Sequence, residues 1–257
     1  MRAGRAVNFS TSHRSRRFRM HPSALRNADR FFKTYAPYRQ GPSVRAVDIG
    51  SQDVNGSLRQ VCPPGVEYVG VDFVEGKGVD VVIDDPYVMP FENDSFDFVI
   101  SSSCFEHSEM FWLLFLELLR ITKPDGVIYI NAPSNAAFHR YPVDCWRFYP
   151  DSGNALVTWG KRSGYHCHLL ESYISDQGSD GRVNDFVATI IKDGNLAARY
   201  PDRITRTYAE FRNGLNDLDS GVLRYEPETE DHRNLLRNQL KAIRKQAKAG
   251  LKRMLSR

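Results

Sequence analysis

Val44-Arg-Ala-Val-Asp-Ile-Gly-Ser-Gln-Asp-Val-Asn-Gly56 joins a β-branched run, Val44–Ile49, to a glycine-containing turn, and with it begins the segment that decides the fold of this 257-residue chain. Further along, Leu-rich Phe111–Thr122 predicts a helix that ends before a tight turn at Lys123–Gly126. Ala28–Tyr38 predicts a short helix whose aromatic residues pack on the main domain. The other runs that predict strands are Tyr68–Val71, Val79–Ile83, Phe96–Ser101, Val127–Ala132, His166–Ile174 and Phe186–Lys192. This alternation is typical of an α/β fold with a mostly parallel sheet flanked by helices.

Three of the predicted strands end in residues that suit a nucleoside. Asp48 and Gly50 lie at the end of the first strand, where glycine lets the backbone approach a ligand without a Cβ clash. Asp72 ends the second strand, 22 residues after Gly50, the offset at which a carboxylate accepts hydrogen bonds from a ribose diol. Asp84-Asp85 ends the third strand, where a carboxylate can accept from an adenine amino group. An NAD-binding protein fits the first two strand ends equally well.

The residues after the third strand decide whether the cofactor is NAD or another nucleoside compound. Cys104-Phe-Glu-His107 follows the fourth strand, and Leu118-Leu-Arg-Ile-Thr-Lys-Pro-Asp-Gly-Val-Ile128 joins the next helix to the fifth strand. With the three strand ends, this ordered series resembles the class I S-adenosylmethionine-dependent methyltransferases, most closely the type 11 branch, over about residues 44–132. The resemblance implies a seven-stranded Rossmann-like sheet and S-adenosylmethionine as the cofactor. The cofactor contacts expected from it are Asp48, Gly50, Ser51, Gln52, Gly56, Asp72, Phe73, Asp84, Asp85 and Ser102.

Two features depart from the pattern of this family, one in the cofactor loop and one in the turn before the fifth strand. Gln52 and Val54 stand where the cofactor loop usually has glycines, and Asp125 occupies the third position of the usual Lys-Pro-Gly-Gly turn. We therefore expect differences in the loop contacts and none in the fold.

The segment after the fifth strand, Asn135–Pro150, gathers aromatic rings among charged side chains. Rings can stack on a sugar face while Asp and Arg bind its hydroxyl groups, so this loop favours a polyhydroxylated acceptor. The segment also resembles one in methyltransferases of bacterial surface-polysaccharide gene clusters. The predicted acceptor-binding residues are Arg140, Tyr141, Asp144, Trp146 and Arg147.

Methyl transfer to an alcohol requires removal of the hydroxyl proton, and histidine is the side chain best suited to this near neutral pH. His139 in the acceptor loop is the first candidate for the base, and His107, after the fourth strand, is the second. Glu106 and His107 are also half of a potential metal site. Because the sequence identifies no further ligand, no metal is assigned to these residues.

Charge is strongly segregated along the chain. Counting Lys and Arg against Asp and Glu, residues 1–40 carry +9, residues 41–232 carry −14 and residues 233–257 carry +9. These counts divide the chain into a basic, partly flexible N-terminal extension with a short helix (1–40), a methyltransferase domain (41–225) and a basic amphipathic C-terminal helix (226–257). The last has Leu236, Leu240, Ile243, Ala247, Leu251 and Met254 at three- and four-residue spacing. It is suited to an anionic membrane surface, to packing on the domain or to a homodimer contact.

The composition narrows the class of protein. The acidic middle disfavours a long nucleic acid across the domain, and no apolar run reaches the roughly 18 residues of a membrane span. The cysteines Cys62, Cys104, Cys145 and Cys167 form no close pair, which favours a cytoplasmic protein, with a membrane-peripheral location as the alternative. We therefore expect an O-methyltransferase acting on a sugar or glycan intermediate in polysaccharide biosynthesis. The alternatives are a methyltransferase of another small molecule or lipid, an RNA methyltransferase, and a non-catalytic nucleotide-binding protein.

Overall fold

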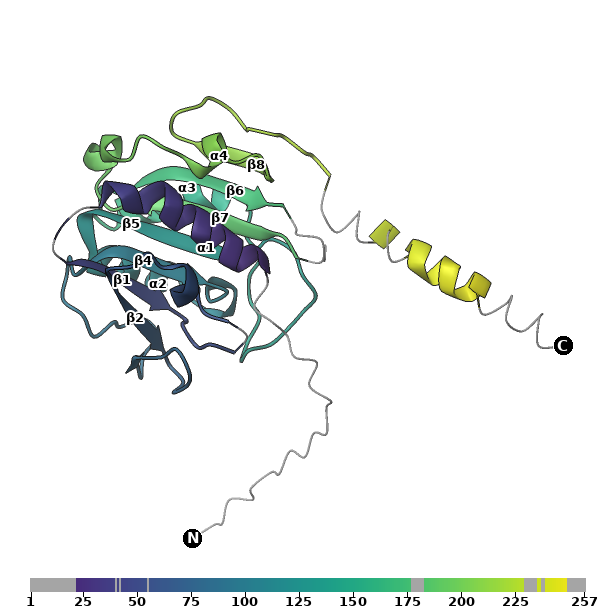
Figure 1. Ribbon diagram of the computed structural model, residues 1–257, viewed down its shortest axis with the longest axis horizontal. Coiled ribbons are helices and arrows are strands. Elements are labelled where there is room, and N and C mark those ends of the chain that lie inside the picture. Colours follow the sequence, from purple (N-terminus) through teal and green to yellow (C-terminus); the bar gives the residue numbers. More distant parts are fainter. Residues whose placement is uncertain are drawn as a thin grey trace, which may run out of the picture.

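The computed structural model describes residues 22–39, 41, 43–54, 56–176, 183–228, 235–236 and 239–248. Its centre is an eight-stranded sheet in the order β3-β2-β1-β4-β5-β7-β6-β8 (Figure 1). The strands are β1 (Val44–Ile49), β2 (Val66–Asp72), β3 (Val81–Val82), β4 (Phe96–Ser102), β5 (Thr122–Pro133), β6 (His168–Ser175), β7 (Asp185–Ile191) and β8 (Phe211–Asn216). The helices are α1 (Pro22–Tyr35), α2 (Phe111–Ile121), α3 (Asp151–Arg162) and α4 (Ile204–Thr207).

The pairing of the strands confirms the predicted mostly parallel, Rossmann-like sheet. β1 pairs in parallel with β2 and β4, β2 with β3, and β4 with β5, whereas β7 runs antiparallel to both β5 and β6. Seven strands match the predicted number, and β8 adds an eighth, antiparallel to β6 at the edge of the sheet. The carboxyl ends of β1 to β5 therefore meet at one edge, where open α/β sheets bind their ligands.

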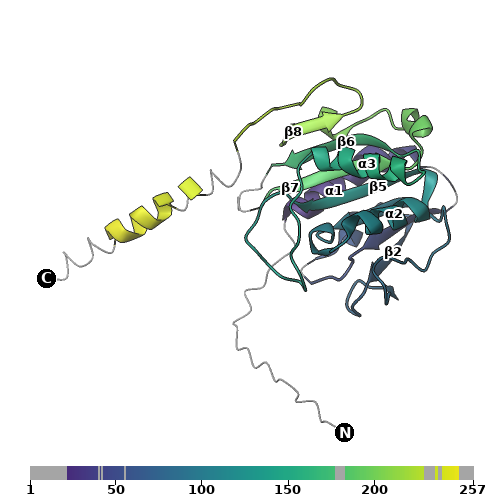
Figure 2. The same ribbon diagram turned by 180° about the vertical axis from the view of Figure 1, so that it is seen from behind.

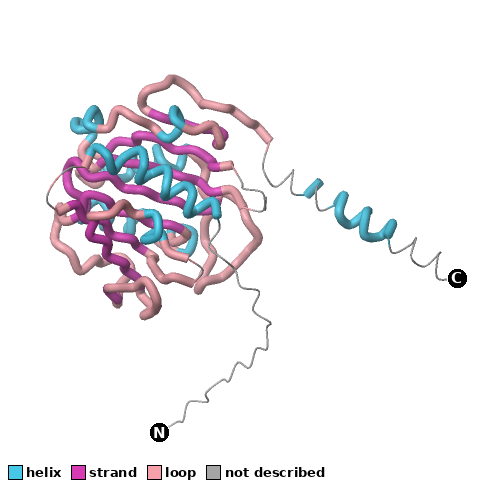
Figure 3. The backbone as a smooth tube through the Cα atoms, viewed as in Figure 1, coloured by secondary structure: helices cyan, strands magenta, loops and turns pink. Residues whose placement is uncertain are grey.

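Helices cover both faces of the sheet. α1 lies across one face (Figure 1), and α2 and α3 lie across the other (Figure 2), so that the strands form the middle layer (Figure 3). Neighbouring residues of one strand face opposite layers: Phe98 packs with α1, whereas Val99 packs with α2 and α3. Burial on both faces explains why the central strands are almost continuously apolar.

The predicted N-terminal helix is longer than the aromatic pattern indicated, because α1 begins at Pro22 and a 3₁₀ turn, η1 (Ala36–Tyr38), follows it. Its aromatic side chains are core residues, as expected: Phe31 is fully buried, with its ring centroid 4.8 Å from that of Tyr129 on β5. Asn27 of the same helix is also buried and donates hydrogen bonds to Asn131 and Ser175.

The turn predicted at Lys123–Gly126 lies within the irregular beginning of β5. Thr122 pairs with Phe96, and regular pairing resumes between Val127 and Phe98. Lys123 reaches across the strands to Asp97, with a 2.8 Å distance between Nζ and Oδ2. Between these two pairs β5 advances five residues while β4 advances two, and the chain folds back on itself: a Cβ on Gly126 would lie 3.0 Å from the carbonyl oxygen of Lys123, as expected of a Pro-Asp-Gly turn.

The basic ends of the chain are described only in part. Residues 1–21, Leu251 and Met254 lie outside the described residues. Several of the basic residues counted in the C-terminal tail lie outside them as well. Residues 239–248 are helical and exposed, and they stand apart from the sheet and its covering helices in Figures 1 and 2. Within the described part of the chain, no helix is both long and apolar enough to cross a membrane.

Candidate functional site

The turn after β1 lies directly against the end of β4. Gly50 has a φ of +84°, a conformation that glycine adopts without strain, and a Cβ there would lie 2.8 Å from the Cβ of Cys104. Gly56 also has a positive φ, +144°, and its N–H donates to Asp53. The structure therefore explains two glycines of the predicted cofactor loop, and it places that loop beside the residues that follow β4.

Asp48 is buried at the end of β1 and accepts a 2.5 Å hydrogen bond from the Tyr68 hydroxyl on β2. Burial raises the pKa of Asp48 to about 7, although the Tyr68 hydrogen bond and the positive charge of Arg59 act in the opposite direction. A carboxyl group whose pKa is raised to near 7 by burial at a strand end is typical of a functional site.

The raised pKa of Asp48 predicts a dependence of stability on pH. An acid whose folded pKa exceeds its unfolded value stabilises the fold below the unfolded pKa and loses this contribution as the pH rises through the folded value. Asp48→Asn should therefore become more stable than the wild type as the pH rises from about 4 to 7, by about 2–4 kcal/mol above that range. Urea unfolding without cofactor measures this difference, and parallel pH profiles for the two proteins would contradict the assignment.

Asp72, at the end of β2, holds the cofactor loop in place. Its two carboxylate oxygens accept from the backbone N–H groups of Gln52 and Val74, each at 3.1 Å. The next side chain, Phe73, is half exposed. An exposed ring beside a carboxylate that faces the loop suits a nucleoside, because the ring can stack while the carboxylate accepts.

The remaining predicted cofactor residues differ in exposure. Asp84 and Asp85 follow β3 and are exposed, and Asp85 accepts a hydrogen bond from the N–H of Tyr87. Ser51 and Ser102 are buried; Ser51 donates to the carbonyl of Gly78, and Ser102 accepts from Asn131. All four lie at the carboxyl ends of strands or in the turns directly after them, as predicted.

Gln52, one of the two departures from the family pattern, connects the cofactor loop to the acceptor loop. Its Oε1 accepts a 2.9 Å hydrogen bond from the hydroxyl of Tyr141. On its other side, its amide packs against Gly76, where a Cβ would lie 2.8 Å from Nε2. A glycine at position 52 would remove this connection, so the substitution has a structural role that the sequence alone did not reveal.

Tyr141→Phe tests the connection between the two loops. The variant keeps the ring and loses the hydrogen bond to Gln52, whose amide becomes accessible to water, so we expect an effect of about 1 kcal/mol, or roughly a fivefold rise in the KM for the cofactor. Tyr149→Phe, which changes another exposed tyrosine of the same segment, is the matched control. Equal KM values in the two variants would show that the hydrogen bond has no part in cofactor binding.

The acceptor loop is organised by an internal ion pair. The Asp144 side chain is buried, and its oxygens lie 2.5 and 2.8 Å from the guanidinium nitrogens of Arg147. Asp144 also accepts from the backbone N–H of His139, and these contacts hold its pKa below its usual range. The sequence analysis assigned Asp144 and Arg147 to the acceptor. In the structure they bind each other and so help to shape the loop, and their contact with the acceptor stays a prediction.

The other predicted acceptor residues face outward. Arg140 and Tyr141 are exposed, and Trp146 is partly exposed while its indole N–H donates to the carbonyl of Ser108. Phe138 is 76% exposed, the highest value among the exposed large apolar side chains of the described residues. This loop therefore offers several rings to a ligand at the edge of the sheet.

Two segments bring three potential metal ligands together at this edge. Glu106 and His107 lie in the 3₁₀ turn η3 (Phe105–His107) directly after β4, and His139 comes from the acceptor loop. The backbone N–H of Cys145 in that loop donates to the carbonyl of Glu106 at 2.8 Å, which joins the two segments. The two imidazole centroids are 5.1 Å apart. Both histidines that the sequence analysis selected thus lie in one cluster.

Burial sets the charge of this cluster. It raises the pKa of Glu106 to about 8 and lowers the pKa of His107, so both groups favour their neutral forms. The Nε2 of His107 lies 3.7 Å from Oε1 of Glu106. Sequence reasoning noted Glu106 but could not assign it a third partner, because His139 is 32 residues after His107.

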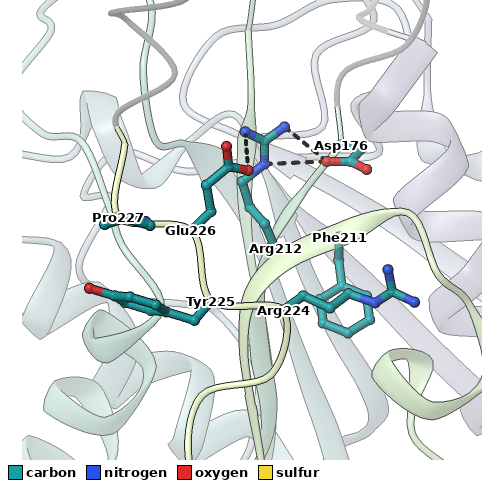
Figure 4. Close-up of a pocket in the computed structure, with 7 residues that line it drawn as sticks. All are labelled: Asp176, Phe211, Arg212, Arg224, Tyr225, Glu226 and Pro227. Atoms are coloured by element: carbon teal, nitrogen blue, oxygen red, sulfur yellow. Dashed lines mark hydrogen bonds and ion pairs between the residues drawn. The ribbon is translucent and has the colours of Figure 1, made fainter.

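A shallow hollow of about 530 Å³ lies elsewhere, beside β8, and is lined by Asp176, Phe211, Arg212, Arg224, Tyr225, Glu226 and Pro227 (Figure 4). Arg212 lies at its centre and pairs with Asp176 at 3.0 Å and with Glu226 at 3.3 Å. Because its guanidinium charge is compensated, and because β8 is remote in the sheet order from β1 to β4, we do not regard this hollow as the active site.

Comparison with known proteins bears on the class of enzyme. Residues 28–130 match the type 11 family model described as "Methyltransferase domain". No curated protein matches the sequence.

Among solved structures, the chain is similar to the 1,6-didemethyltoxoflavin-N1-methyltransferase of Burkholderia thailandensis. The TM-score is 0.51 at 15% identity, over 66% of this chain and 79% of that one. A putative sarcosine dimethylglycine methyltransferase from Galdieria sulphuraria has a TM-score of 0.47 at 14% identity, over 66% and 86% of the two chains. The first likeness shows a shared fold, and the family match confirms the predicted enzyme class, a methyltransferase that uses S-adenosylmethionine.

Proposed function

We propose that the protein transfers the methyl group of S-adenosylmethionine to a hydroxyl group of a sugar or glycan intermediate. The observation that carries this proposal is the meeting of the two loops: the cofactor loop and the ring-bearing acceptor loop are joined by the hydrogen bond between Gln52 and Tyr141. The histidine cluster lies at the same edge, beside the end of β4 that Gly50 contacts. Cofactor, acceptor and proton-accepting groups would therefore meet in one place.

The cofactor assignments follow the strand ends. Asp72 accepts from the ribose hydroxyls, Phe73 stacks beside the nucleoside, and Asp48 and Gly50 lie near the methionine part. Asp85, with Asp84 beside it, accepts from the adenine amino group. During transfer, the bond between the methyl carbon and sulfur breaks as the bond to the acceptor oxygen forms, and the sulfonium becomes the neutral thioether of S-adenosylhomocysteine. Catalysis of such an in-line displacement depends largely on positioning the two reactants.

The exposed rings of the acceptor loop support a sugar acceptor. Phe138 and Tyr149 are more than half exposed and can stack on the apolar face of a pyranose, and exposed Arg140 can donate to its hydroxyl groups.

Activation of the acceptor hydroxyl is assigned to the imidazoles of His107 and His139. Each ring has its Nδ1 beside a backbone carbonyl, of Val143 and Ala137 respectively, so in the neutral ring Nδ1 carries the proton and Nε2 keeps its lone pair. His139, with a half-exposed side chain, is the more accessible of the two. As the sequence predicts, its Nε2 can take the hydroxyl proton directly.

Two measurements test the proposal in sequence. Calorimetric titration of the full chain with S-adenosylmethionine should give a saturable heat that NAD does not give; binding of NAD alone would refute the cofactor assignment. Transfer of labelled methyl from S-adenosylmethionine is then measured on a panel of free sugars, nucleotide sugars and lipid-linked sugars. Labelling of a planar heterocycle and of none of the sugars would refute the acceptor class while leaving the methyltransferase intact.

The planar heterocycle is the second candidate acceptor, because the same exposed rings can stack on it. The structurally similar Burkholderia enzyme was solved with 1,6-didemethyltoxoflavin and S-adenosylhomocysteine. Methylation of such an acceptor would occur on a ring nitrogen and would not require Arg140, whereas a sugar acceptor would. The KM of Arg140→Ala for each acceptor therefore separates the two candidates.

The basic C-terminal helix favours contact with an anionic membrane. Leu236, Leu240 and Ile243 are at least half exposed at helical spacing, and Lys241 and Lys245 lie among them. A helix with an uncovered apolar stripe and a basic remainder is suited to the interface of an anionic bilayer. Such contact would bring the enzyme to an acceptor assembled on a lipid carrier.

Reversing the charge of Lys241, Arg244, Lys245 and Lys248 to glutamate should abolish this contact. Each basic residue near an anionic surface contributes about 1 kcal/mol, so loss of the four alone predicts a partition coefficient at least about 100-fold lower. Sedimentation with phosphatidylserine vesicles measures it, and neutral phosphatidylcholine vesicles are the control. Equal sedimentation of wild type and variant would exclude membrane contact by this helix. Dimerisation abolished by Leu240→Asp would place it at a homodimer contact instead.

A further inference from the structure

Glu106, His107 and His139 each direct one ligand-type atom to a common point. One oxygen of the carboxylate and one nitrogen of each imidazole all lie within 4.8 Å of one another. It is the one group of three or more such side chains found among the described residues. Glu106 is buried, His107 is partly buried and His139 is exposed, so the cluster is closed on one side and accessible on the other.

The burial of Glu106 leaves one of its side-chain oxygens without a hydrogen-bond partner among the described residues. Its residue is 1% exposed, and its Oε2 has no hydrogen-bond partner in the described part of the chain. Burying a carboxylate oxygen without a partner is costly, and native proteins rarely leave such a group unexplained. A cation bound at the cluster would supply the missing partner.

The two histidines are already oriented as metal ligands are. The Nδ1 atom of His107 lies 2.5 Å from the carbonyl oxygen of Val143, and that of His139 lies 3.0 Å from the carbonyl oxygen of Ala137. A carbonyl oxygen only accepts, so both rings donate from Nδ1 and keep the lone pair on Nε2. Metal-binding histidines usually donate their second ring N–H to a carbonyl or carboxylate, which fixes the ring orientation. Asp144, 3.5 Å from Nδ1 of His139, adds a carboxylate to this outer layer.

We infer that Glu106, His107 and His139 form a binding site for one divalent cation that prefers nitrogen and oxygen ligands, such as Zn²⁺, Mn²⁺ or Co²⁺. Ligand bonds of about 2.0–2.2 Å place neighbouring ligand atoms about 3–4 Å apart. The 3.7 Å distance between His107 Nε2 and Glu106 Oε1 meets this requirement. The side chain of His139 is half exposed, so it can move the short distance that brings its nitrogen equally close to the other two ligand atoms. Two imidazoles and one carboxylate leave coordination positions open for a further oxygen.

This inference rests on the proposed methyl transfer to a hydroxyl group and gives the histidine pair a different part in it, as ligands of the cation in place of a direct base. A cation at the cluster would bind the acceptor oxygen in an open position and lower the pKa of its hydroxyl group. The hydroxyl proton would pass to water, and the alkoxide would attack the methyl carbon. The imidazoles would then activate the acceptor through the cation and would not themselves take the proton.

The test is a titration of the full chain with Co²⁺ after removal of metals with a chelator, followed by visible ligand-field absorption. We expect saturation at one Co²⁺ per chain. Glu106→Gln and His139→Ala should each weaken Co²⁺ binding by at least about tenfold, since even loss of an outer-layer partner has effects of this size. His168→Ala is the matched control, because this histidine pairs with Asp217 away from the cluster and its loss should leave Co²⁺ binding unchanged.

The result separates the cation site from the proposed function. No saturable Co²⁺ signal, or the same affinity in wild type, Glu106→Gln and His139→Ala, overturns the inference. His139→Ala changes a half-exposed side chain and so remains informative if Glu106→Gln fails to fold. Calorimetry with S-adenosylmethionine on the same samples tests the cofactor independently: binding of the cofactor without Co²⁺ refutes only the cation site, and binding of Co²⁺ without the cofactor refutes the proposed function.

Discussion

His139→Ala is expected to lower kcat for methyl transfer by about 10²–10⁴-fold, the range by which positioned acid–base groups accelerate reactions. The imidazole is held at its Nδ1 by the carbonyl of Ala137, while the loop that carries it is held by the pair of Asp144 and Arg147. Its lone pair on Nε2 is therefore positioned before the acceptor arrives. Removal of the ring takes away that lone pair. The loss is expected both if the lone pair accepts the hydroxyl proton and if it binds a cation that lowers the pKa of the hydroxyl group.

The measurement is a single-turnover assay at saturating cofactor. The dissociation constant of S-adenosylmethionine should change little in His139→Ala, because none of the predicted cofactor contacts is lost. His168→Ala controls for the removal of an imidazole elsewhere and should retain wild-type kcat. Full activity of His139→Ala would remove this residue from the reaction and leave His107 as the group that activates the acceptor.

Asp72→Ala is expected to raise the dissociation constant of S-adenosylmethionine by about 100-fold. Two hydrogen bonds from ribose hydroxyls to a carboxylate contribute about 3 kcal/mol together. The same side chain accepts from the N–H groups of Gln52 and Val74, so its removal also loosens the cofactor loop. Both effects act on cofactor binding and neither acts directly on the reaction step.

Calorimetry on the purified variant measures this change, and Glu67→Ala is the matched control. Glu67 lies at the other end of the same strand, where it pairs with Arg45 at 3.1 Å, so its loss removes a carboxylate without touching the cofactor edge. Asp72→Asn, which keeps one acceptor oxygen, should lie between wild type and Asp72→Ala. Unchanged affinity in Asp72→Ala would refute the central assignment of the site.

The strands of the sheet could be predicted because each buried strand is encoded by residues that are consecutive in the chain. A buried parallel strand has to be apolar over its whole length, and the ends of such strands are where polar residues follow. Val44–Ile49 was therefore recognisable with its exact bounds, and the order of the strands along the chain was enough to place Asp48 and Asp72 at one edge. The edge strand β8 was not predicted, because Phe211–Asn216 is mostly polar and pairs with one strand, β6.

The sequence by itself determined the fold and the order of the strand ends, and it supplied the prediction of the cofactor loop, since each depends on residues close together in the chain. Tertiary structure alone decided three other matters. It joined Gln52 to Tyr141 across 89 residues, and it paired Asp144 with Arg147 within the acceptor loop. It also brought His139 to Glu106 and His107. The physical reason is the same in each case: the partners of a side chain depend on how loops from different strands pack at the shared edge, and no local pattern of residues specifies that packing.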